Sequence, residues 1–319
     1  MKTLQRLLTC SSIIAMSCQL YAQQDAMYTH YMYNTLAVNP AYAGTRDALT
    51  VTGLGRKQWV GFAGAPTSIT GTAHMPLGEK MGVGLSFIND QIGPLKNNQI
   101  YVDLAYHVKL SEKSKLSFGI KGGVNLWSAN LGNLKTLNDN QTDPSQYNYN
   151  INNNLTPNVG AGLYYHRERF YIGVSVPKLL NNKIGTTSVT TSNGSVSTNL
   201  LTEQYHWFVI MGTVFNLSQD VKLKPTALLK ATAAAPLEGD LTGTFIFNNK
   251  LNLGAMYRTN DAVGLLLGLN LNPQFYVGYS FDWSFTNNTA KYNRGSHEVM
   301  LRYDLIFNNK EQIKSPRYF

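Results

Sequence analysis

Residues 115–127 read KLSFGIKGGVNLW, and this stretch indicates most clearly how the chain folds. Apolar residues alternate in it with polar residues or glycine. Leu116 and Phe118 therefore share one face of a strand, whereas Ser117 and Lys121 share the other, because successive side chains in a strand point to opposite faces. The stretch predicts a strand with one apolar and one polar face, and it lacks the spacing of an amphipathic helix.

The same two-residue period recurs along the chain, and is clear again in residues 275–285 and 297–307. Most repeats have about the 9–11 residues that a tilted strand needs to cross a hydrocarbon layer. The expected strands lie near 48–58, 67–75, 81–89, 98–110, 115–131, 156–166, 169–177, 204–216, 221–231, 239–248, 251–259, 262–271, 275–285 and 297–307. We predict an all-β fold, a transmembrane up-and-down antiparallel β-barrel of about fourteen strands over residues 48–307.

The connections between these segments support a membrane barrel independently. Even-numbered connections, such as residues 111–114 and 249–250, are tight turns. Odd-numbered ones include the long, Asn-, Thr- and Ser-rich stretches 132–155, 178–203 and 286–296. Short periplasmic turns alternating with long external loops are typical of outer-membrane barrels. A soluble β-sandwich, the alternative, has no reason to alternate loop length in this way.

In such a barrel the apolar face meets lipid and the polar face lines the lumen. Charged residues of the polar face are expected to point inward: Asp103, Lys109, Lys121, Lys222, Lys224, Lys230, Arg258, Asp282, Glu298, Arg302 and Asp304. Mutually paired charges that fill the lumen are favoured over a selective ion path, which stays the alternative. Tryptophans near strand ends are expected in an interfacial girdle: Trp59, Trp127, Trp207 and Trp283.

The first 22 residues are typical of a secretory signal peptide. Lys2 and Arg6 precede an apolar stretch too short to cross a bilayer as a helix, and Ala22 offers a small-residue cleavage point. The alternatives are an amphipathic first helix, or lipidation at Cys18. The only other cysteine, Cys10, also lies in this stretch, so the exported chain would hold no disulfide or cysteine–metal site.

No motif indicates an enzyme, a metal or a cofactor. The six histidines are scattered without ligand spacing, and neither a phosphate loop nor a Gly-x-Ser-x-Gly elbow is present. Asp139-x-Gln141-x-Asp143 lacks the glycine and the distal glutamate of a calcium loop. The formal net charge of +9 is compatible with nucleic acid, anionic lipid or an acidic partner. Export and the even spread of basic residues argue against nucleic acid.

Residues 23–47 precede the first strand and are rich in tyrosine, as at Tyr31 and Tyr42. Such an apolar segment is not expected to hang in water. A fourteen-strand barrel is wide enough to need filling, so the segment is expected to plug the lumen or to cap its periplasmic mouth. The alternative is a lead-in that packs under the rim. Within the segment, Pro40 and Gly44 predict a turn.

Residues 24–44, and above all Asn39-Pro40-Ala41-Tyr42-Ala43-Gly44, resemble the opening signature of the PorP/SprF family. Further similarity lies in Arg56-x-x-Trp59, Pro66-Thr67, Gly82-x-Gly84, Asn89-Asp90-x-x-Gly93-Pro94 and the final residues 315–319. The resemblance covers essentially the whole exported chain. It implies an outer-membrane protein of the type IX secretion and gliding machinery of Bacteroidota.

The resemblance further implies an accessory, non-enzymatic barrel that captures, exports or anchors a secreted surface protein (an adhesin) through its C-terminal domain. It also implies contact with lipoproteins or periplasmic components of the machinery. Candidate plug or partner-binding residues are Tyr31, Asn34, Asn39, Pro40, Tyr42, Gly44, Arg317, Tyr318 and Phe319. The alternatives are a diffusion channel or hydrophobic-solute transporter, and a purely structural barrel. Residues 308–319 are expected to form a periplasmic tail that docks on a partner or folds back on the barrel.

Overall fold

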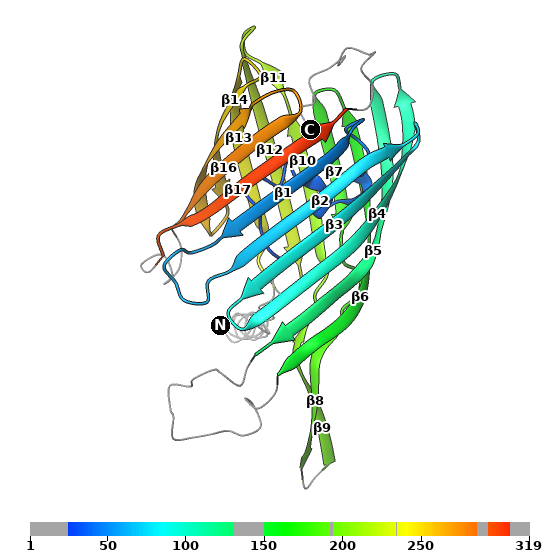
Figure 1. Ribbon diagram of the computed structural model, residues 1–319, viewed down its shortest axis with the longest axis vertical. Helices are drawn as coiled ribbons and strands as arrows, with labels where there is room; N and C mark the ends of the chain where they lie inside the picture. The colour runs from blue at the N-terminus through cyan, green and yellow to red at the C-terminus, as the bar shows by residue number, and fades with distance from the viewer. Residues whose placement is uncertain (1–24, 131–149, 192–193, 234, 286–292, 307–319) are drawn as a thin grey trace, which may run out of the picture.

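The computed structural model describes residues 25–130, 150–191, 194–233, 235–285 and 293–306. Its main sheet is a closed antiparallel β-barrel of fourteen strands, so the predicted fold is confirmed (Figure 1). The strands are β1 (Leu49–Lys57), β2 (Thr67–Leu77), β3 (Met81–Ile92), β4 (Leu95–Ser111), β5 (Ser114–Ala129), β6 (Ile151–Arg167), β7 (Phe170–Val176), β10 (His206–Thr213) with its short continuation β11 (Phe215–Asn216), β12 (Val221–Thr232), β13 (Glu238–Phe247), β14 (Leu251–Arg258), β15 (Ala262–Asn270), β16 (Phe275–Ser284) and β17 (Ser296–Leu305).

The first and last strands close the barrel. β1 pairs with β17 from Leu49↔Leu305 to Lys57↔His297, and with β2 along its other side. β10 pairs with both β7 and β12, so every strand of the main sheet except the short β11 has a partner on both sides. In hydrocarbon no water is present to hydrogen-bond a free strand edge, so closure is what allows the strands to lie in a membrane.

Burial alternates along the strands in the sense opposite to that of a water-soluble protein. On the outer face Ile120, Leu265 and Trp283 are 63%, 67% and 64% exposed, whereas the inward carboxylates of Asp103 and Glu298 are fully buried. An apolar band on the outside and polar residues within are what a barrel in lipid requires. No helix in the described ranges has the length and apolar content needed to cross a membrane.

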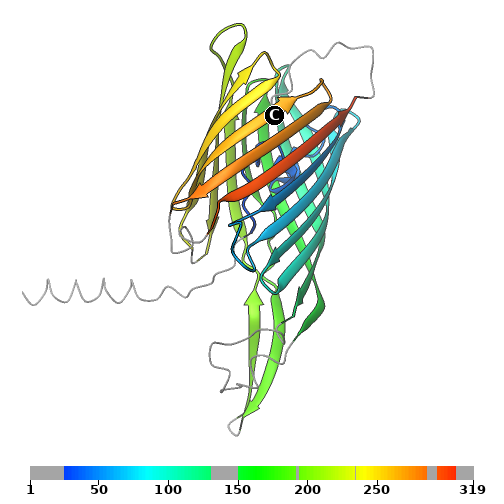
Figure 2. The same cartoon turned by 60° about the vertical axis from the view of Figure 1, so that its left-hand side comes forward.

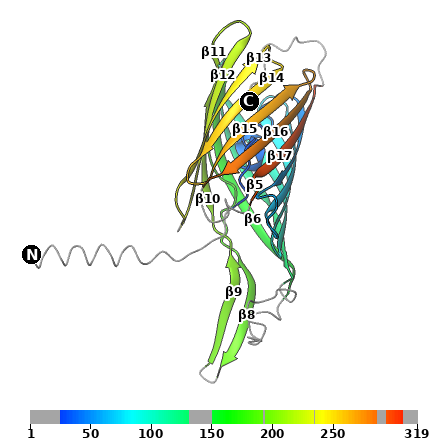
Figure 3. The same cartoon turned by 90° about the vertical axis from the view of Figure 1, so that its left-hand side faces the viewer.

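The connections differ in part from the expectation. The stretch expected as a long loop at 178–203 contains a second sheet, the hairpin of β8 (Lys183–Thr191) and β9 (Gly194–Thr202). This hairpin projects beyond the barrel at the end opposite the short turns (Figures 2 and 3). Ile184 and Leu201 pack at its base, but the rest of its sequence is mainly Thr and Ser, so the two-residue period that revealed the other strands was absent. Alternation in length also fails at Gly93–Pro94 and at residues 259–261, two odd-numbered connections that are short.

One predicted orientation is wrong. Trp127 was expected in an interfacial girdle, but its side chain lies inside, 8% exposed, and its Nε1 donates to Glu203 Oε1 at 3.0 Å. Trp207 and Trp283 do face outward, at 50% and 64% exposure. Trp127 occupies the inward phase of β5 together with Asn125, and the polar partner for its indole N–H lies beyond β9, far away in sequence.

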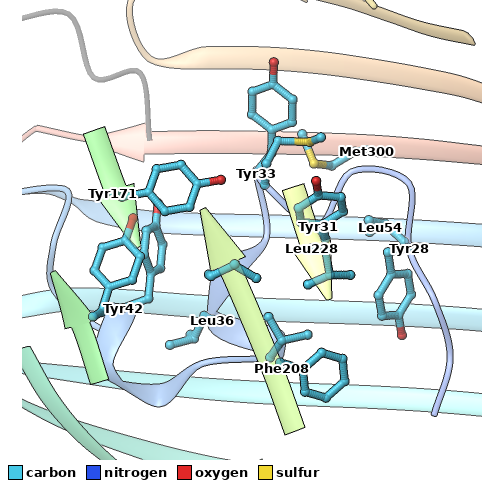
Figure 4. Packing of buried hydrophobic residues seen from close by; sticks show 14 of the residues in the cluster. Tyr28, Tyr31, Tyr33, Leu36, Tyr42, Leu54, Tyr171, Phe208, Leu228 and Met300 are labelled. Atoms are coloured by element: carbon cyan, nitrogen blue, oxygen red, sulfur yellow. The ribbon is translucent and has the colours of Figure 1, made fainter. Parts of the chain in front are cut away.

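Residues 25–47 thread the barrel from one end to the other, and we call them the plug. Asp25 contacts Lys178 and Lys230 at the end that carries the β8–β9 hairpin, the long-loop end. Arg46 contacts Asp304 at the opposite, short-turn end. Between them lie two single-turn 3₁₀ helices, η1 (Thr35–Ala37) and η2 (Pro40–Tyr42). Figure 4 shows the plug crossing the inside of the barrel, with Tyr31 and Tyr33 among wall residues.

Glycines in the wall let the plug approach closely. Gly44 has φ +76°, and a Cβ there would lie 2.6 Å from the Cα of Gly82 in β3. A Cβ on Gly119 in β5 would collide with the backbone of Ala41. Backbone against backbone at such distances excludes any side chain. The plug motif and the wall glycines are therefore complementary surfaces, although they are far apart in sequence.

The predicted signal peptide at 1–22 with Cys18, the Asp139–Asp143 loop and the tail at 308–319 lie outside the described residues. The same holds for three of the candidate site residues, Arg317, Tyr318 and Phe319.

Candidate functional site

The lumen holds most of the charged residues that were expected to point inward. Nine are buried there: Asp103, Lys121, Lys224, Lys230, Arg258, Asp282, Glu298, Arg302 and Asp304. Lys109 and Lys222 occupy the inward phase of their strands but lie at the short-turn rim. There Lys109 faces Glu79 at 3.5 Å in solvent, and Lys222 donates to Asn249 Oδ1 at 2.7 Å. A strand longer than the bilayer leaves its last inward residues outside the lumen.

A buried charge network fixes the first turn of the plug to the wall. The Glu298 carboxylate accepts hydrogen bonds from the backbone N–H groups of Thr29 and His30, at 2.9 and 2.7 Å, and contacts His30 Nδ1 at 2.7 Å. Arg56 bridges Glu298 at 3.2 Å and Asp282 at 2.7 Å. Charge-assisted hydrogen bonds that are fully desolvated are among the strongest in proteins. The network joins the plug to β1, β16 and β17.

Two further buried ion pairs tie neighbouring strands together, and one of them also holds the middle of the plug. Arg258 contacts Asp240 through two hydrogen bonds, of 2.9 and 2.8 Å. Lys121 lies 3.4 Å from Asp103 and donates to the carbonyl oxygens of Leu36 and Ala37 at 3.2 and 3.3 Å, at the end of η1. The charged residues at these places are therefore paired with each other, and Lys121 also binds the plug.

The residues of the opening motif are buried against the wall. Asn39 caps η2 by accepting from Ala41 N at 3.0 Å, while its Nδ2 donates to the Leu163 carbonyl at 3.0 Å. The Tyr42 ring meets Tyr164 edge to face, with centroids 5.4 Å apart. Pro40 supplies the first residue of η2, where its fixed φ suits the turn.

The remaining candidates of the plug also contact the barrel. The Tyr31 hydroxyl donates to Thr226 Oγ1 at 3.2 Å, and Asn34 Oδ1 accepts from Thr72 Oγ1 at 2.8 Å. Gly44 N donates to His74 Nδ1 at 3.1 Å. Tyr31, Asn34, Asn39, Pro40, Tyr42 and Gly44 are all buried. In this arrangement they are plug residues, and none is available to a partner without displacement of the plug.

The long-loop end is organised by two acidic residues that the sequence did not single out. Asp25 contacts Lys178 and lies 3.5 Å from His206. Burial alone would raise the pKa of the Asp25 carboxyl, but Lys178, His206 and Lys230 outweigh it and hold that pKa below its usual range. The charge partners of Asp25 come from three different strands or connections, so no local pattern could have identified this cluster.

The second acidic residue is Glu203, at the base of the hairpin. Its carboxylate accepts from Asn125 at 2.6 Å, Trp127 at 3.0 Å and Asn182 at 2.7 Å. A cavity of about 200 Å³ lies beside it, between the plug and the wall, lined mainly by apolar side chains such as Phe208. Glu203 therefore links the projecting hairpin rigidly to the inner wall of the barrel. The described residues contain no group of three or more His, Cys, Asp or Glu that could hold a metal ion.

Solved structures of a bacterial channel and a transporter resemble this barrel. Among solved structures the barrel is similar to the CymD monoaromatic hydrocarbon channel, with a TM-score of 0.51, 11% identity, and coverage of 87% of this chain and 94% of that chain. It is also similar to the Ralstonia pickettii toluene transporter TbuX, with a TM-score of 0.52, 8% identity, and coverage of 86% and 93%. At these identities the likeness shows the fold alone. No curated protein matches the chain.

The family model of the type IX secretion system membrane protein PorP/SprF matches residues 20–303, which include the plug and all but the end of the last strand. The match covers nearly the whole chain and agrees with the outer-membrane barrel found in the structure. This chain therefore belongs to the PorP/SprF family of type IX secretion system membrane proteins.

Proposed function

We propose that this barrel is a non-enzymatic accessory component of the type IX machinery that retains a secreted protein, such as an adhesin, at the cell surface. The observation that carries the proposal is the fixed plug. Thr29 and His30 are bonded to Glu298, and Arg56 bridges Glu298 and Asp282 without exposure to solvent. Breaking one buried ion pair costs about 3–5 kcal/mol, so the plug is expected to stay in the lumen. A barrel whose lumen stays closed is better suited to hold a partner protein than to conduct solutes.

The partner surface would lie at the long-loop end. In the described part of the chain β8 and β9 pair only with each other, so each has one edge free for strand addition. Glu203 anchors the base of this hairpin to the barrel. An extended segment from the C-terminal domain of the secreted partner would pair with one of these edges. A contact of the tail at 308–319 with periplasmic lipoproteins of the machinery remains a second proposed interface.

The rival function is a diffusion channel or hydrophobic-solute transporter, and it requires the plug to move. A disulfide between plug and wall separates the two functions. We choose Asn34 in the plug and Thr72 in β2, because their side chains are hydrogen-bonded at 2.8 Å and the described chain contains no cysteine. Oxidised N34C/T72C protein should shift on a non-reducing gel after cleavage between plug and barrel.

Cells that carry the oxidised N34C/T72C protein should display the secreted partner as the wild type does. The single variants N34C and T72C control for the substitutions themselves. Deletion of residues 183–202, which removes the hairpin, should release the partner into the medium while the barrel still inserts. Loss of display in the oxidised double variant, restored by a reductant, would show that the plug must move and would contradict the fixed plug on which the proposal rests.

A further inference from the structure

A second pocket opens at the short-turn end of the lumen, remote from the long-loop surface considered above. Its volume is about 360 Å³, far more than the roughly 30 Å³ share of one water molecule. The plug contributes Tyr33 and Arg46, and the wall contributes Lys224, Tyr276, Arg302 and Asp304. The pocket therefore has room for a small ligand together with water.

The pocket is strongly basic. Of the described residues that line it, Arg46, Lys224, Lys250 and Arg302 are cationic, and Asp304 is the one carboxylate. Arg46 already engages both oxygens of Asp304, through Nε at 3.3 Å and a terminal nitrogen at 2.8 Å. The charge of Asp304 is thus largely neutralised by Arg46, which leaves an excess of positive charge around the cavity.

Two of these cations are buried side by side around a pair of tyrosines. Lys224 is 1% exposed and Arg302 is 8% exposed. The Lys224 ammonium lies 4.4 Å from the centroid of the Tyr33 ring, and the Arg302 guanidinium lies 5.1 Å from that of Tyr276. Tyr33 and Tyr276 are themselves stacked at 4.9 Å. Among the charges that act on Lys224 are Arg302 and Arg46, both repulsive.

The Arg302 side chain, which lines this cavity, has an unused hydrogen-bond donor. Arg302 Nε has no hydrogen-bond acceptor in the described chain, and its separation from Asp304 Oδ2 is 3.6 Å. Arg56 Nε and Arg258 Nη1 also lack an acceptor among the described residues, but both of those guanidinium groups bond to a carboxylate through another nitrogen. A buried guanidinium donor without an acceptor is costly, and the cation–π contact of Arg302 offsets only part of that cost.

We propose that this pocket binds an oxyanion, a phosphate or carboxylate group, between Lys224 and Arg302. A guanidinium presents a planar set of N–H donors that matches both groups, and an ammonium adds a second point of attraction. The stacked tyrosines form one wall, against which an organic part attached to the anion would lie. The inference does not depend on the retention function, because it concerns the other end of the barrel.

Isothermal titration of the purified, detergent-solubilised full-length barrel tests the site with three probes at equal ionic strength: inorganic phosphate, acetate and chloride. Phosphate or acetate should bind at least tenfold more tightly than chloride, and the preferred probe identifies the group. K224M and R302M should each weaken that binding at least tenfold. K222M is the matched control, because Lys222 lies two residues away on β12 and at the rim, and it should change affinity less than twofold.

A second measurement separates a binding role from a structural one. The midpoint of heat-induced unfolding without oxyanion is the baseline for the wild type, K222M and K224M. With the preferred probe, the midpoint of heat-induced unfolding on gels should rise for the wild type and K222M but not for K224M. Equal affinity for all three probes, or wild-type oxyanion affinity in both K224M and R302M, would overturn the proposal.

Discussion

Replacement of Glu298 by alanine should release the beginning of the plug. Glu298 accepts from Thr29 N and His30 N, contacts the His30 ring and pairs with Arg56. Its removal takes one carboxylate away from Arg56 and leaves the backbone N–H groups of Thr29 and His30 without their acceptor, in a buried site. Breaking a buried pair in this way costs about 3–5 kcal/mol. Since about 1.4 kcal/mol is tenfold in an equilibrium constant, local opening of the plug should become roughly 10²- to 4 × 10³-fold more frequent.

Hydrogen exchange followed by mass spectrometry measures this opening directly in peptides from residues 25–47. Faster exchange is expected for Thr29 and His30 in E298A, while peptides from the strands keep their protection. Glu79→Ala is the matched control, because Glu79 is 84% exposed in its contact with Lys109 and should leave plug exchange unchanged. If E298A exchanges within a factor of three of E79A, the network does not hold the plug and the reasoning fails.

Three other perturbations test separate parts of the account. Gly44→Ala should displace the plug or prevent stable folding, because Gly44 has φ +76° and a Cβ there would collide with Gly82. Gly53→Ala is the control: a Cβ there has nothing within 4 Å, so the variant should migrate as the wild type does in heat-modifiability gels. The pKa of Asp25 is lowered, so its ion pair with Lys178 should persist at every pH above the ordinary pKa of a carboxyl group and be lost only as the pH falls below that value. In D25N the pair is absent, so the additional substitution A26C should react with maleimide already at neutral pH. A protease site inserted between Thr191 and Gly194 should be cut on intact cells and one between Ser111 and Ser114 should not, and the reverse pattern would invert the proposed topology.

The strands could be predicted because each carries its own signal. In β5 and β17 every second side chain meets lipid and must be apolar, so a few residues such as Phe118 and Leu301 reveal the strand without reference to the rest of the chain. The same local rule indicated that Glu298 and Arg302 lie on the other face. It did not extend to the rims, where Lys109 and Lys222 lie beyond the lumen.

Contacts between distant segments had no local signal. The β8–β9 hairpin was missed because only its base, at Ile184 and Leu201, packs against the barrel, and strands that project beyond lipid and core need no apolar alternation. Trp127 was misplaced because its partner, Glu203, lies 76 residues away in the sequence. The path of the plug depends on Gly82 and Gly119, whose reason for being glycine becomes apparent only when Ala41 and Gly44 lie against them.

The plug closes the lumen in this structure, and single-channel conductance in planar bilayers tests this directly. The wild-type barrel should give no steady open current, since residues 25–47 cross the lumen and are bonded to its wall at both ends. A variant without residues 25–47, refolded and inserted in the same way, should give large, stable openings and so prove that insertion is detected. Stable openings of comparable size in the wild type would contradict the plugged barrel and favour a diffusion channel.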